Sequence, residues 1–443
     1  MLDIKYIREN SEKVKKAARD KGIDLDVEEL LQVDKRRREM QQELDEVKRE
    51  RKQLAQSSGG KAPSQEQIQK GKELKEKITE LEEKHRQTEE KYLDLMARVP
   101  MVPSEDTPIG EDDAENVEIY REGEPTEFDF TPKDHIQLGK ELDLFDLERG
   151  VKTAGYRGYY LKNEGAMLQM ALMMYSLTKL IEKGFTPIIP PTLVKNFALF
   201  GSGFFAGRQY DPETDEIYKI ANDEILPDGS VKKEDKFLVG TAEPSLLAYY
   251  AGETLEEKDL PIKFCGFSPC YRSEIGSYGK DTKGLYRIHE FMKVEQVAIC
   301  RADEEEAGKL HQEMTEISKE LHRELKLPFR QLQICTGDMG KPKYKMYDLE
   351  AWMPSRENYG ETGSASNCKD WQSRRLNIKY KDGQGDNKFT YMLNNTALAS
   401  PRILIPILEN NQQKDGSVLI PEVLQKFMPG EQKIISNKKG GEL

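Results

Sequence analysis

The sequence predicts an α+β protein in which an N-terminal antiparallel helical hairpin precedes a domain built on a mainly antiparallel sheet. Two observations lead to this prediction. Apolar residues recur at heptad spacing near the N-terminus. The second half of the chain contains a succession of strand-like segments with few helices between them. At 443 residues the chain is too long for one ordinary core, so we expect more than one domain.

The hairpin is expected to consist of two long helices. The first runs from Asp26 to about Gln56, and the segment SSGGKAPSQ then breaks it. The heptad positions are Leu30, Val33, Arg37, Met40, Leu44, Val47, Arg51 and Leu54, and after the break Leu74, Ile78, Leu81, His85, Thr88, Tyr92 and Leu95. Helices joined by a short turn fold back antiparallel. Each arm of about 30 residues spans roughly 45 Å, so we expect residues 26–98 to project into solvent.

Basic side chains are frequent on this arm, and acidic ones are almost as numerous. The basic positions are Lys35, Arg36, Arg37, Arg38, Lys48, Arg49, Arg51, Lys52, Lys70, Lys72, Lys75, Lys77 and Lys84. Two interpretations remain open. The arm is either a structural coiled coil with a charge-paired, solvated surface or a finger that contacts the phosphates of a large partner. We favour phosphate contact.

Prolines and an acidic strip separate the hairpin from the rest of the chain. Pro100, Pro103 and Pro108 end the helical region, and EDDAENVEIYREGEPTEF resembles a linker. We therefore expect an N-terminal domain over residues 1–108, a second domain over 109–432 and a flexible tail over 433–443.

The second domain begins with short strands near residues 151–165 and an apolar helix from Ala166 to Lys183. FTPIIPPTLV then predicts a buried strand interrupted by proline. An amphipathic helix is expected from Asp303 to Leu325, with Asp303 as N-cap. The remaining strands are expected in KFCGFSPCYRSE, YRIHEFMKVEQVAIC, FRQLQICT, KMYDLEAWMP, RRLNIKY and FTYMLNNTALA.

Composition limits the classes of partner and compartment. The net charge of -12 and the pI near 5.3 do not attract a polyanion, so any nucleic-acid contact requires local basic patches. The five cysteines form no CxxC pair, which favours free thiols in a reducing cytosol over disulfides or zinc. No apolar run is long enough to span a membrane, and the first residues lack a hydrophobic signal core. We expect a cytoplasmic protein with no membrane partner.

The segment from Tyr271 to Glu295 predicts a nucleotide-handling hairpin. Arg272 and Glu274 share one side of its first strand, and Gly276 and Gly279 lie in a polar loop. The return strand alternates Arg287, His289, Phe291, Lys293 and Glu295. A guanidinium can bind phosphate, and a ring can stack on a base. The alternative is an exposed hairpin with a charge-paired face. GxxxxGK[ST] and GxGxxG are absent from the sequence, so side chains on a sheet would have to hold a nucleotide.

Four further segments carry polar residues where a core should be apolar. VGTAEPSLL contains Thr241 to Glu243 between a strand and a helix, and ETGSASN from Glu361 to Asn367 is expected to be a short polar run between strands. Asn394, Asn395 and Thr396 interrupt a strand. Arg402 begins an apolar helix, where backbone amides and a guanidinium both favour an anion.

Taken in order, these segments resemble the seryl-tRNA synthetases, class II aminoacyl-tRNA synthetases with an N-terminal coiled-coil arm. The resemblance covers nearly the whole chain through TAE, YRSE followed by RIHEFMKVE, ETGSASNC and MLNNTALASPR. It implies a class II catalytic domain, ATP as substrate and Mg2+ as cofactor. The chain departs from the family pattern at three places. Gly363 replaces a serine and Ala365 a cysteine, Asn395 and Thr396 replace the Gly-Ser of bacterial relatives, and GYRG at Gly155 to Gly158 stands where relatives have GARF.

The resemblance also implies residue roles. Arg272, Arg402 and Glu361 are the implied catalytic residues. The implied ATP-binding set is Arg272, Ser273, Glu274, Arg287, Ile288, Phe291, Glu361, Thr362, Gly363, Ser364 and Arg402, with Glu361 and Ser364 as magnesium ligands. The implied serine-binding set is Thr241, Ala242, Glu243, Arg272, Glu295, Asn394 and Thr396.

The expected activity is therefore ATP-dependent activation of L-serine to seryl-adenylate, followed by transfer to the 3′ end of tRNA(Ser) by a homodimer. Charging of tRNA(Sec) is left open. The alternatives are a catalytically inactive nucleotide-binding paralogue and a ligase that feeds a carrier protein. Intact Arg272, Glu274, Glu361 and Arg402 argue against the first alternative, and the basic hairpin argues against the second.

Overall fold

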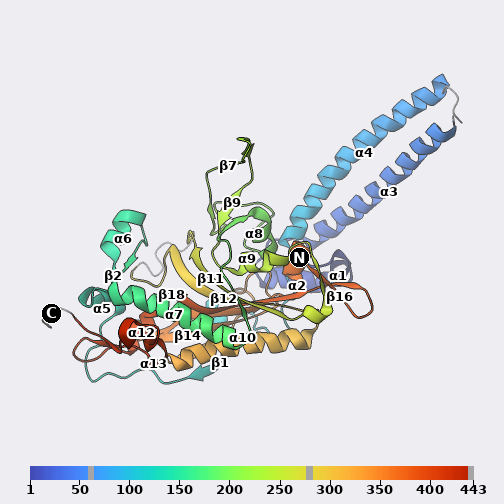
Figure 1. Cartoon of the computed structure of the whole chain (residues 1–443). Coiled ribbons are helices and arrows are strands. Elements are labelled where there is room, and N and C mark those ends of the chain that lie inside the picture. The colour runs from blue at the N-terminus through green and yellow to red at the C-terminus, as the bar shows by residue number, and fades with distance from the viewer. Residues whose placement is uncertain (58–63, 276–282, 438–443) are drawn as a thin grey trace. The chain divides into compact units, whose positions relative to one another are not determined.

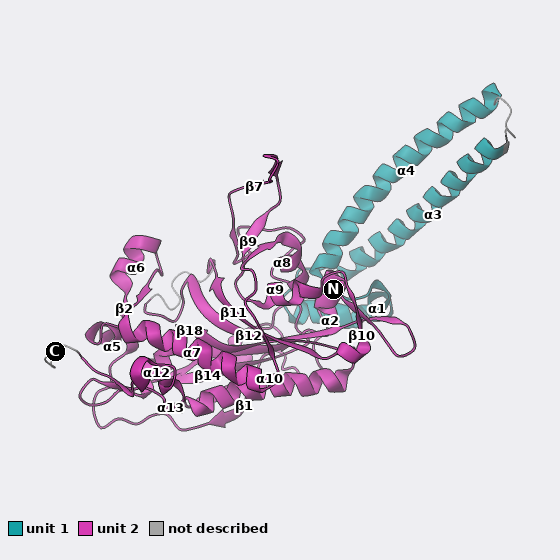
Figure 2. Cartoon of the chain, in the orientation of Figure 1, with its two compact units in different colours: residues 1–100 teal, residues 101–443 magenta. Residues whose placement is uncertain are grey.

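The computed structural model describes residues 1–57, 64–275 and 283–437 (Figure 1). The chain divides into two compact units, residues 1–100 and 101–443 (Figure 2). The boundary falls at Pro100, eight residues before the predicted one at position 108.

The first unit contains the predicted helical hairpin. Two short helices, α1 (Ile4–Glu9) and α2 (Ser11–Asp20), precede α3 (Val27–Ser57) and α4 (Gln65–Arg98). The buried seam between α3 and α4 consists of Leu44, Val47, Leu74, Ile78 and Leu81, which confirms the heptad pattern. Ser64 begins α4 in a capping box with Gln67, so two backbone N–H groups at the helix start are satisfied. The predicted helix break at residues 58–63 lies outside the described residues.

Ion pairs along the arm show that its helices are antiparallel. Glu29, near the start of α3, pairs with Lys91, near the end of α4, at 2.5 Å, and Glu43, further along α3, pairs with Lys77, earlier on α4, at 3.0 Å. Near the distal end, Glu50 accepts from Lys70 at 2.9 Å. Much of the arm's charge is therefore paired. Several of its cations nevertheless make no ion pair within the described residues, among them Arg36, Arg49, Arg51, Lys52, Lys72 and Lys75.

The base of the arm is built on a buried carboxylate. Asp34 on α3 is fully buried and accepts from Arg8 Nε of α1 at 2.8 Å. Arg38 and Arg37, one turn further along α3, donate to the same carboxylate at 3.2 and 3.4 Å. Because a buried charge without partners is very costly, these contacts fix α1 against α3.

The second unit contains an eight-stranded sheet with the strand order β1-β13-β14-β15-β18-β12-β11-β4. The strands are β1 (Val117–Glu122), β13 (Phe329–Gln333), β14 (Lys345–Met353), β15 (Asn358–Asn367), β18 (Tyr391–Ser400), β12 (Glu290–Cys300), β11 (Ile262–Tyr271) and β4 (Thr186–Ile188). All neighbours are antiparallel except β11 and β4. The predicted α+β fold with a mainly antiparallel sheet is confirmed.

Helices cover the sheet on both faces. The apolar helix α7 (Asn163–Glu182) and the amphipathic helix α10 (Glu304–Glu324) share one core with Val294 and Ala298 of β12. On the other face, α9 (Glu243–Leu247) packs with Val297 and Ile299. Because side chains alternate along a strand, residues 294, 296 and 298 face α10 and residues 293, 295 and 297 face α9.

Several local predictions can be compared directly. Both α7 and α10 are present as predicted, and Asp303 caps α10 by accepting from Glu306 N at 2.8 Å. The prediction for ETGSASN was wrong, because these residues form most of the central strand β15, paired with β14 and β18. Glycine and serine have low strand propensity, but pairing on both sides outweighs it.

Two short strand predictions were also partly wrong. Residues Val151 to Ala154 belong to helix α6 (Leu147–Ala154), which Asp146 caps by accepting from Arg149 N. Likewise Arg374 to Leu376 end helix α11 (Trp371–Leu376), and only the following residues form a strand, β16 (Lys379–Lys381). In both places a short helix ends at a residue with positive φ, Gly155 or Asn377, which a strand pattern did not reveal.

The five cysteines are free and buried. Burial raises the pKa of the Cys265 thiol to about 12 and the pKa of Cys300 still further. In the part of the chain that the structure describes, no helix has the length and apolar character to cross a membrane. Near the C-terminus, Ile434–Ile435 pair with Val418–Leu419, and the residues of the predicted tail from 438 onward lie outside the described residues.

Candidate active site

The predicted nucleotide-handling hairpin is present, with shorter strands than expected. β11 ends at Tyr271 and β12 begins at Glu290, so Arg272, Glu274, Arg287 and His289 lie beyond the strand ends. A backbone hydrogen bond from Arg272 N to His289 O, 2.9 Å long, still joins the two sides. Glu274 leaves the extended conformation with a φ of 55°. The predicted loop glycines Gly276 and Gly279 lie outside the described residues.

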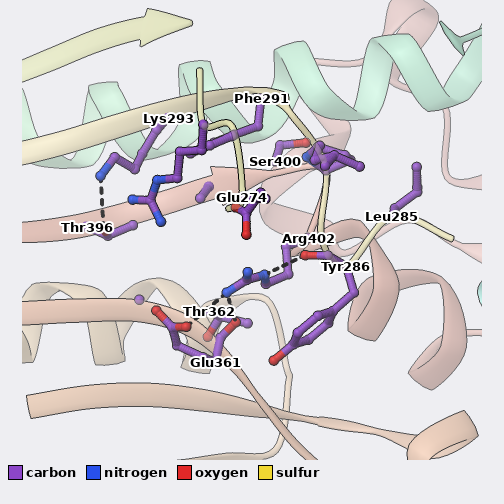
Figure 3. A pocket seen from close by; sticks show the side chains of 15 residues that line it. Glu274, Leu285, Tyr286, Phe291, Lys293, Glu361, Thr362, Thr396, Ser400 and Arg402 are labelled. Atoms are coloured by element: carbon purple, nitrogen blue, oxygen red, sulfur yellow. Dashed lines mark hydrogen bonds and ion pairs between the residues drawn. The ribbon is translucent and has the colours of Figure 1, made fainter. Parts of the chain in front are cut away.

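A cavity opens beside this hairpin, over β12, β15 and β18 (Figure 3). Nine of the predicted site residues line it, namely Arg272, Glu274, Ile288, Phe291, Glu361, Thr362, Gly363, Thr396 and Arg402. The other lining residues are Leu285, Tyr286, Lys293, Ala399, Ser400 and Pro401. Segments distant in sequence therefore meet at one place.

Arg402 is held at one side of the cavity. Its Nε donates to the carbonyl of Tyr286 at 3.0 Å, and its Nη1 is 3.1 Å from both the carbonyl and the carboxylate of Glu361. Its guanidinium also lies over the Tyr286 ring, 4.4 Å from the centroid. Figure 3 shows Arg402 between these two residues. Arg402 comes two residues before helix α12 (Leu404–Asn410).

Arg272 lies beside an aromatic ring. Its Nε donates to the carbonyl of Gly240 at 3.3 Å, and its guanidinium lies 5.4 Å from the centre of Phe291. Glu274, buried nearby, accepts from Arg287 Nη1 at 2.6 Å, and Arg157 is 4.0 Å away. Two guanidinium groups, Arg272 and Arg402, and one stacking ring thus line the same cavity.

Acidic groups gather below Glu361. Asp348 on β14 lies opposite Ser364 on β15. Burial, reinforced by the Glu361 carboxylate, raises the pKa of Asp348 well above its ordinary value, against a hydrogen bond from Ser364. Asp348 Oδ1 is buried and has no hydrogen-bond partner among the described residues. Hydroxyl and carboxylate oxygens in this arrangement suit a hard cation.

Two β-bulges shape the sheet at the cavity. Leu349 pairs with Gly363 and Glu350 with Glu361, which leaves Thr362 as the extra residue in β15. Similarly, Val294 pairs with Leu398 and Glu295 with Thr396, which leaves Ala397 as the extra residue in β18. A bulge changes the direction of neighbouring side chains, and bulges are common next to active sites.

The predicted serine-binding residues form a buried polar group. Glu243 accepts from Gln372 Nε2 at 2.7 Å and from Asn394 Nδ2 at 3.0 Å. Thr241 Oγ1 accepts from Glu243 N at 3.3 Å, and Ala242 lies between them, fully buried. Burial, with a smaller contribution from Glu295, raises the pKa of Glu243 against the opposing charge of Lys343. Thr241 to Glu243 lie between β9 (Lys236–Leu238) and α9, as predicted.

Lys293 and Thr396 join this group to the cavity. Lys293 Nζ is 2.5 Å from Glu295 Oε2 and 3.4 Å from Thr396 Oγ1, and all three side chains are buried. Thr396 Oγ1 in turn lies 3.4 Å from Glu295 Oε2. Of these three residues, Lys293 and Thr396 line the cavity. Buried Lys293 therefore compensates the Glu295 carboxylate directly, and the charge of Lys343 acts on Glu243.

Some site residues were missed, and some predicted ones do not line the cavity. Eight predicted residues lie outside its lining, namely Ser273, Arg287 and Ser364 of the ATP-binding set and Thr241, Ala242, Glu243, Glu295 and Asn394 of the serine-binding set. Arg287 nevertheless pairs with Glu274, and Ser364 with Asp348.

The missed residues are Tyr286, Asp348 and Gln372. Lys293 was expected on the same face as Phe291 and Glu295, but no role was assigned to it. Asp348 is brought to the site by cross-strand pairing and Gln372 by a short helix, which no local pattern shows. Tyr286 lies inside the predicted hairpin segment, between its two strands.

Comparisons with known proteins agree with this architecture. A model of the seryl-tRNA synthetase N-terminal domain matches residues 1–103, and a model of the tRNA synthetase class II core domain (G, H, P, S and T) matches residues 224–411. The serine--tRNA ligase of Deinococcus radiodurans is 42% identical over 98% of both chains. That of Borreliella burgdorferi is 42% identical over 96% of this chain and 98% of its own.

Solved structures extend the likeness to three dimensions. Seryl-tRNA synthetase from Pyrococcus horikoshii, complexed with ATP, superposes with a TM-score of 0.87 at 37% identity, covering 99% of this chain and 100% of that one. The cytoplasmic enzyme from Naegleria fowleri, in complex with AMP, gives a TM-score of 0.84 at 29% identity, covering 99% of both chains. The chain belongs to the seryl-tRNA synthetase family.

Proposed function

We propose that the protein activates L-serine with ATP and then transfers serine to the 3′ end of tRNA(Ser). In the first step a serine carboxylate oxygen attacks the α-phosphorus, and pyrophosphate leaves. In the second, a ribose hydroxyl at the tRNA 3′ end attacks the seryl carbonyl, and AMP leaves. The observation that carries the proposal is the meeting of Arg272, Arg402 and Phe291 around one cavity beside a buried, charge-compensated polar group.

The two arginines are proposed to act by alignment and charge stabilisation. The serine carboxylate is already ionised, so the first step requires no protein base. Arg272 would hold the α-phosphate and the entering carboxylate, and Arg402 the γ-phosphate. Contacts to Tyr286 and Glu361 fix the direction of Arg402 before substrate binds, which is what electrostatic preorganisation requires.

Adenine recognition is proposed for Phe291, Glu274 and the backbone of Ile288. Phe291 offers a ring face in the cavity, and Ile288 is buried in the same lining. Glu274 would accept from the adenine amino group while its contact with Arg287 keeps it oriented. Ser273, Thr362 and Gly363 complete the proposed ATP-binding set through the backbone next to these groups.

Magnesium is proposed to bind at Glu361 and Ser364. The fit rests on the acidic surroundings, where the orphaned Oδ1 of Asp348 and the Glu361 carboxylate repel one another unless a cation or proton compensates them. Asp348 is added as a third ligand. When bound, the ion would neutralise phosphate charge.

Serine is proposed to bind in the buried polar group. Thr241 and Glu243 would receive the ammonium end, and Glu295 the hydroxyl, with Asn394 and Thr396 lining the pocket. A buried carboxylate that accepts from the substrate hydroxyl discriminates strongly against alanine, which would leave it unpaired. Exclusion of threonine depends on volume and is expected to be weaker.

The arm and the dimer are proposed to serve tRNA binding. The arm cations that make no ion pair within the described residues are suited to phosphate contact. Exposed Met170, Met174 and Ile181 on α7, each close to half exposed, support a homodimer interface. We also propose the functional division into residues 1–108 and 109–432, and cytoplasmic location on the basis of five free thiols.

Pyrophosphate exchange tests the activity directly. Purified protein with Mg2+, ATP and labelled pyrophosphate should form labelled ATP only when serine is present. Alanine should support almost no exchange and threonine a little. Transcripts of tRNA(Ser) and tRNA(Sec) in parallel charging reactions then define the second substrate. Exchange with no serine dependence would contradict the proposed function.

A further inference from the structure

Helix α10 carries a buried polar stripe directly beneath the cavity, on the opposite face of the sheet. Ser318 and His322 are both fully buried, and their i, i+4 spacing places them on one side of the helix. Most of the buried α10 side chains around them are apolar. Most buried polar groups are hydrogen-bonded, and those that are bonded rigidify the elements they join, so the partners of Ser318 and His322 indicate their role.

Ser318 is bound to the strands that form the serine side of the cavity. Its hydroxyl donates to the carbonyl of Thr396 at 3.0 Å and accepts from Asn395 Nδ2 at 2.9 Å and Gln296 Nε2 at 3.1 Å. Asn395 and Gln296 face α10, whereas their neighbours Thr396 and Glu295 face the cavity side. One serine hydroxyl therefore fixes the backbone on which Thr396 is carried.

His322 is bound to the strand that forms the ATP side. Its Nδ1 lies 2.7 Å from the carbonyl of Ser318 and its Nε2 lies 2.8 Å from Thr362 Oγ1. Because a carbonyl only accepts, Nδ1 carries the proton, and in the neutral ring Nε2 accepts from Thr362. The hydroxyl of Thr362 also lies 3.1 Å from the carbonyl of Leu349, so its single proton is shared between two acceptors.

The contacts of Ser318 and His322 lie just beyond the point where backbone pairing between β15 and β18 ends. β15 and β18, both within the described residues, pair from Asn367↔Leu393 to Ala365↔Asn395, and the ladder ends there. Beyond that point lie the bulges at Thr362 and Ala397. A Cβ atom on Gly363 would lie 3.3 Å from the Thr396 carbonyl, so the two strands remain in close contact without a ladder.

We propose that Ser318 and His322 are positioning residues that hold the two bulged strands, and with them Thr396 and the Glu361–Gly363 segment, at the spacing that the serine and ATP halves of the site require. The proposal rests on the function proposed above. Neither residue lines the cavity. Their effect on the reaction is exerted through Thr396 and Thr362.

Loss of the Ser318 hydrogen bonds and loss of the His322 hydrogen bonds are expected to have different kinetic effects. Ser318→Ala is expected to raise the KM for serine about tenfold while the KM for ATP changes less than about twofold, since a misplacement near 1 Å costs that much or more. His322→Leu is expected to raise the KM for ATP and lower kcat by similar factors, with the KM for serine little changed. His322→Gln restores an acceptor near Thr362 and is expected to recover most of the activity.

Thr315→Val provides the matched control. Thr315 is also buried on α10, but its hydroxyl donates only within the helix, to the carbonyl of His311 at 2.7 Å. Loss of the Thr315 hydroxyl should lower the stability of the protein without changing the KM for serine or the KM for ATP. Thr362→Val removes the His322 contact from the strand side, so it tests the same bond if His322→Leu does not fold.

The measurement is pyrophosphate exchange with the full-length protein, normalised to active sites by the pyrophosphate burst. A serine-selective effect of Ser318→Ala together with an ATP-selective effect of His322→Leu and Thr362→Val supports the proposal. Equal changes in both KM values, or a reduced active fraction with unchanged constants, overturns it. If the wild type itself lacks serine-dependent exchange, the proposed function fails instead, so the two failures are distinguishable.

Discussion

The Nη1 atom of Arg402 lies 3.1 Å from the Oε2 atom of Glu361, so the cation proposed to bind the γ-phosphate is held by the carboxylate proposed to bind magnesium. This pairing joins two parts of the site that are 41 residues apart in sequence. When ATP and magnesium bind, Glu361 would hold the metal ion and Arg402 the γ-phosphate, so each of the two charges would still have a partner of opposite sign.

The first prediction concerns this pair. Arg402→Lys keeps the charge but loses the fork that contacts Tyr286 and Glu361 together, and is expected to lower kcat for exchange by about 100-fold. Arg356→Ala is the control, because Arg356 lies over the same Tyr286 ring, 4.2 Å from its centroid, without lining the cavity. Similar losses in both variants would show that only packing on Tyr286 matters.

A second prediction tests the serine pocket. Glu295→Gln is expected to raise the KM for serine at least about tenfold and to leave the KM for ATP nearly unchanged, because the carboxylate accepts more strongly than an amide. Glu290→Gln, an exposed position at the start of the same strand, should alter neither constant. Unchanged serine dependence in Glu295→Gln exchange kinetics would exclude its pocket role.

Removing the distal arm should separate the two steps. Thr88 Oγ1 lies 3.5 Å from the sulfur of Met40, so a short Gly-Ser linker can replace residues 41–87. We expect serine-dependent exchange to persist and aminoacylation to fall by more than about 100-fold, since phosphate contacts dominate nucleic-acid affinity.

Point variants on the arm test the same division of labour. Arg51→Ala removes a cation with no ion pair among the described residues, and it should weaken charging more than Lys48→Ala, which removes a cation paired with Glu82. Equal loss of exchange and charging would contradict this division.

The magnesium proposal predicts a pH-dependent metal requirement. The pKa of Asp348 is raised by burial and by Glu361, so its proton competes with the metal ion as the pH falls. The Mg2+ concentration for half-maximal exchange should therefore rise at lower pH in the wild type. Asp348→Asn should need more Mg2+ throughout and show a weaker pH dependence. An identical Mg2+ titration in wild type and variant would remove Asp348 from the site.

Buried histidines predict a loss of stability at acidic pH. Burial lowers the pKa of both His311 and His322 from the ordinary value of 6.5 to about 4. Between these two pKa values the unfolded chain binds more protons than the folded protein, so the free energy of unfolding decreases as the pH falls. The folded state is therefore fully stabilised above pH 6.5 and loses this stabilisation as the pH falls toward 4. Each histidine contributes about 3 kcal/mol to that pH dependence.

Denaturant unfolding of wild type, His311→Gln and His322→Gln between about pH 4 and pH 7 measures this effect. Each substitution should flatten the curve of unfolding free energy against pH, although it also lowers stability at neutral pH. Parallel curves for wild type and variants would contradict neutral burial of these rings.

Periodic patterns revealed the long elements of this fold. Heptads identified the arm, and the 3.6-residue pattern with an acidic first turn identified α10. The central strand β15 escaped, because ETGSASN has low strand propensity and is made a strand only by its two neighbours. Strand ends near Arg272 were misjudged because a positive φ at Glu274 is set by tertiary contacts.

Site residues were predictable where one sequence motif contains several of them. They were not predictable where tertiary packing brings in a single residue from another segment. Phe291 and Arg402 were found through their motifs, and both line the cavity. Asp348 lies inside an ordinary alternating strand, and Gln372 lies on a short helix that the sequence did not predict. Their roles arise from cross-strand pairing and from a 2.7 Å contact with Glu243, neither of which leaves a local pattern.

The inaccessible thiols have a practical consequence for spectroscopy. Because all five cysteines are buried, with strongly raised pKa values at Cys265 and Cys300, the native protein should react slowly with maleimides. A single cysteine introduced at an exposed arm position can then be labelled without first replacing the natural ones. Fluorescence energy transfer between such a label and a dye on the tRNA would report how the coiled coil moves when nucleic acid binds.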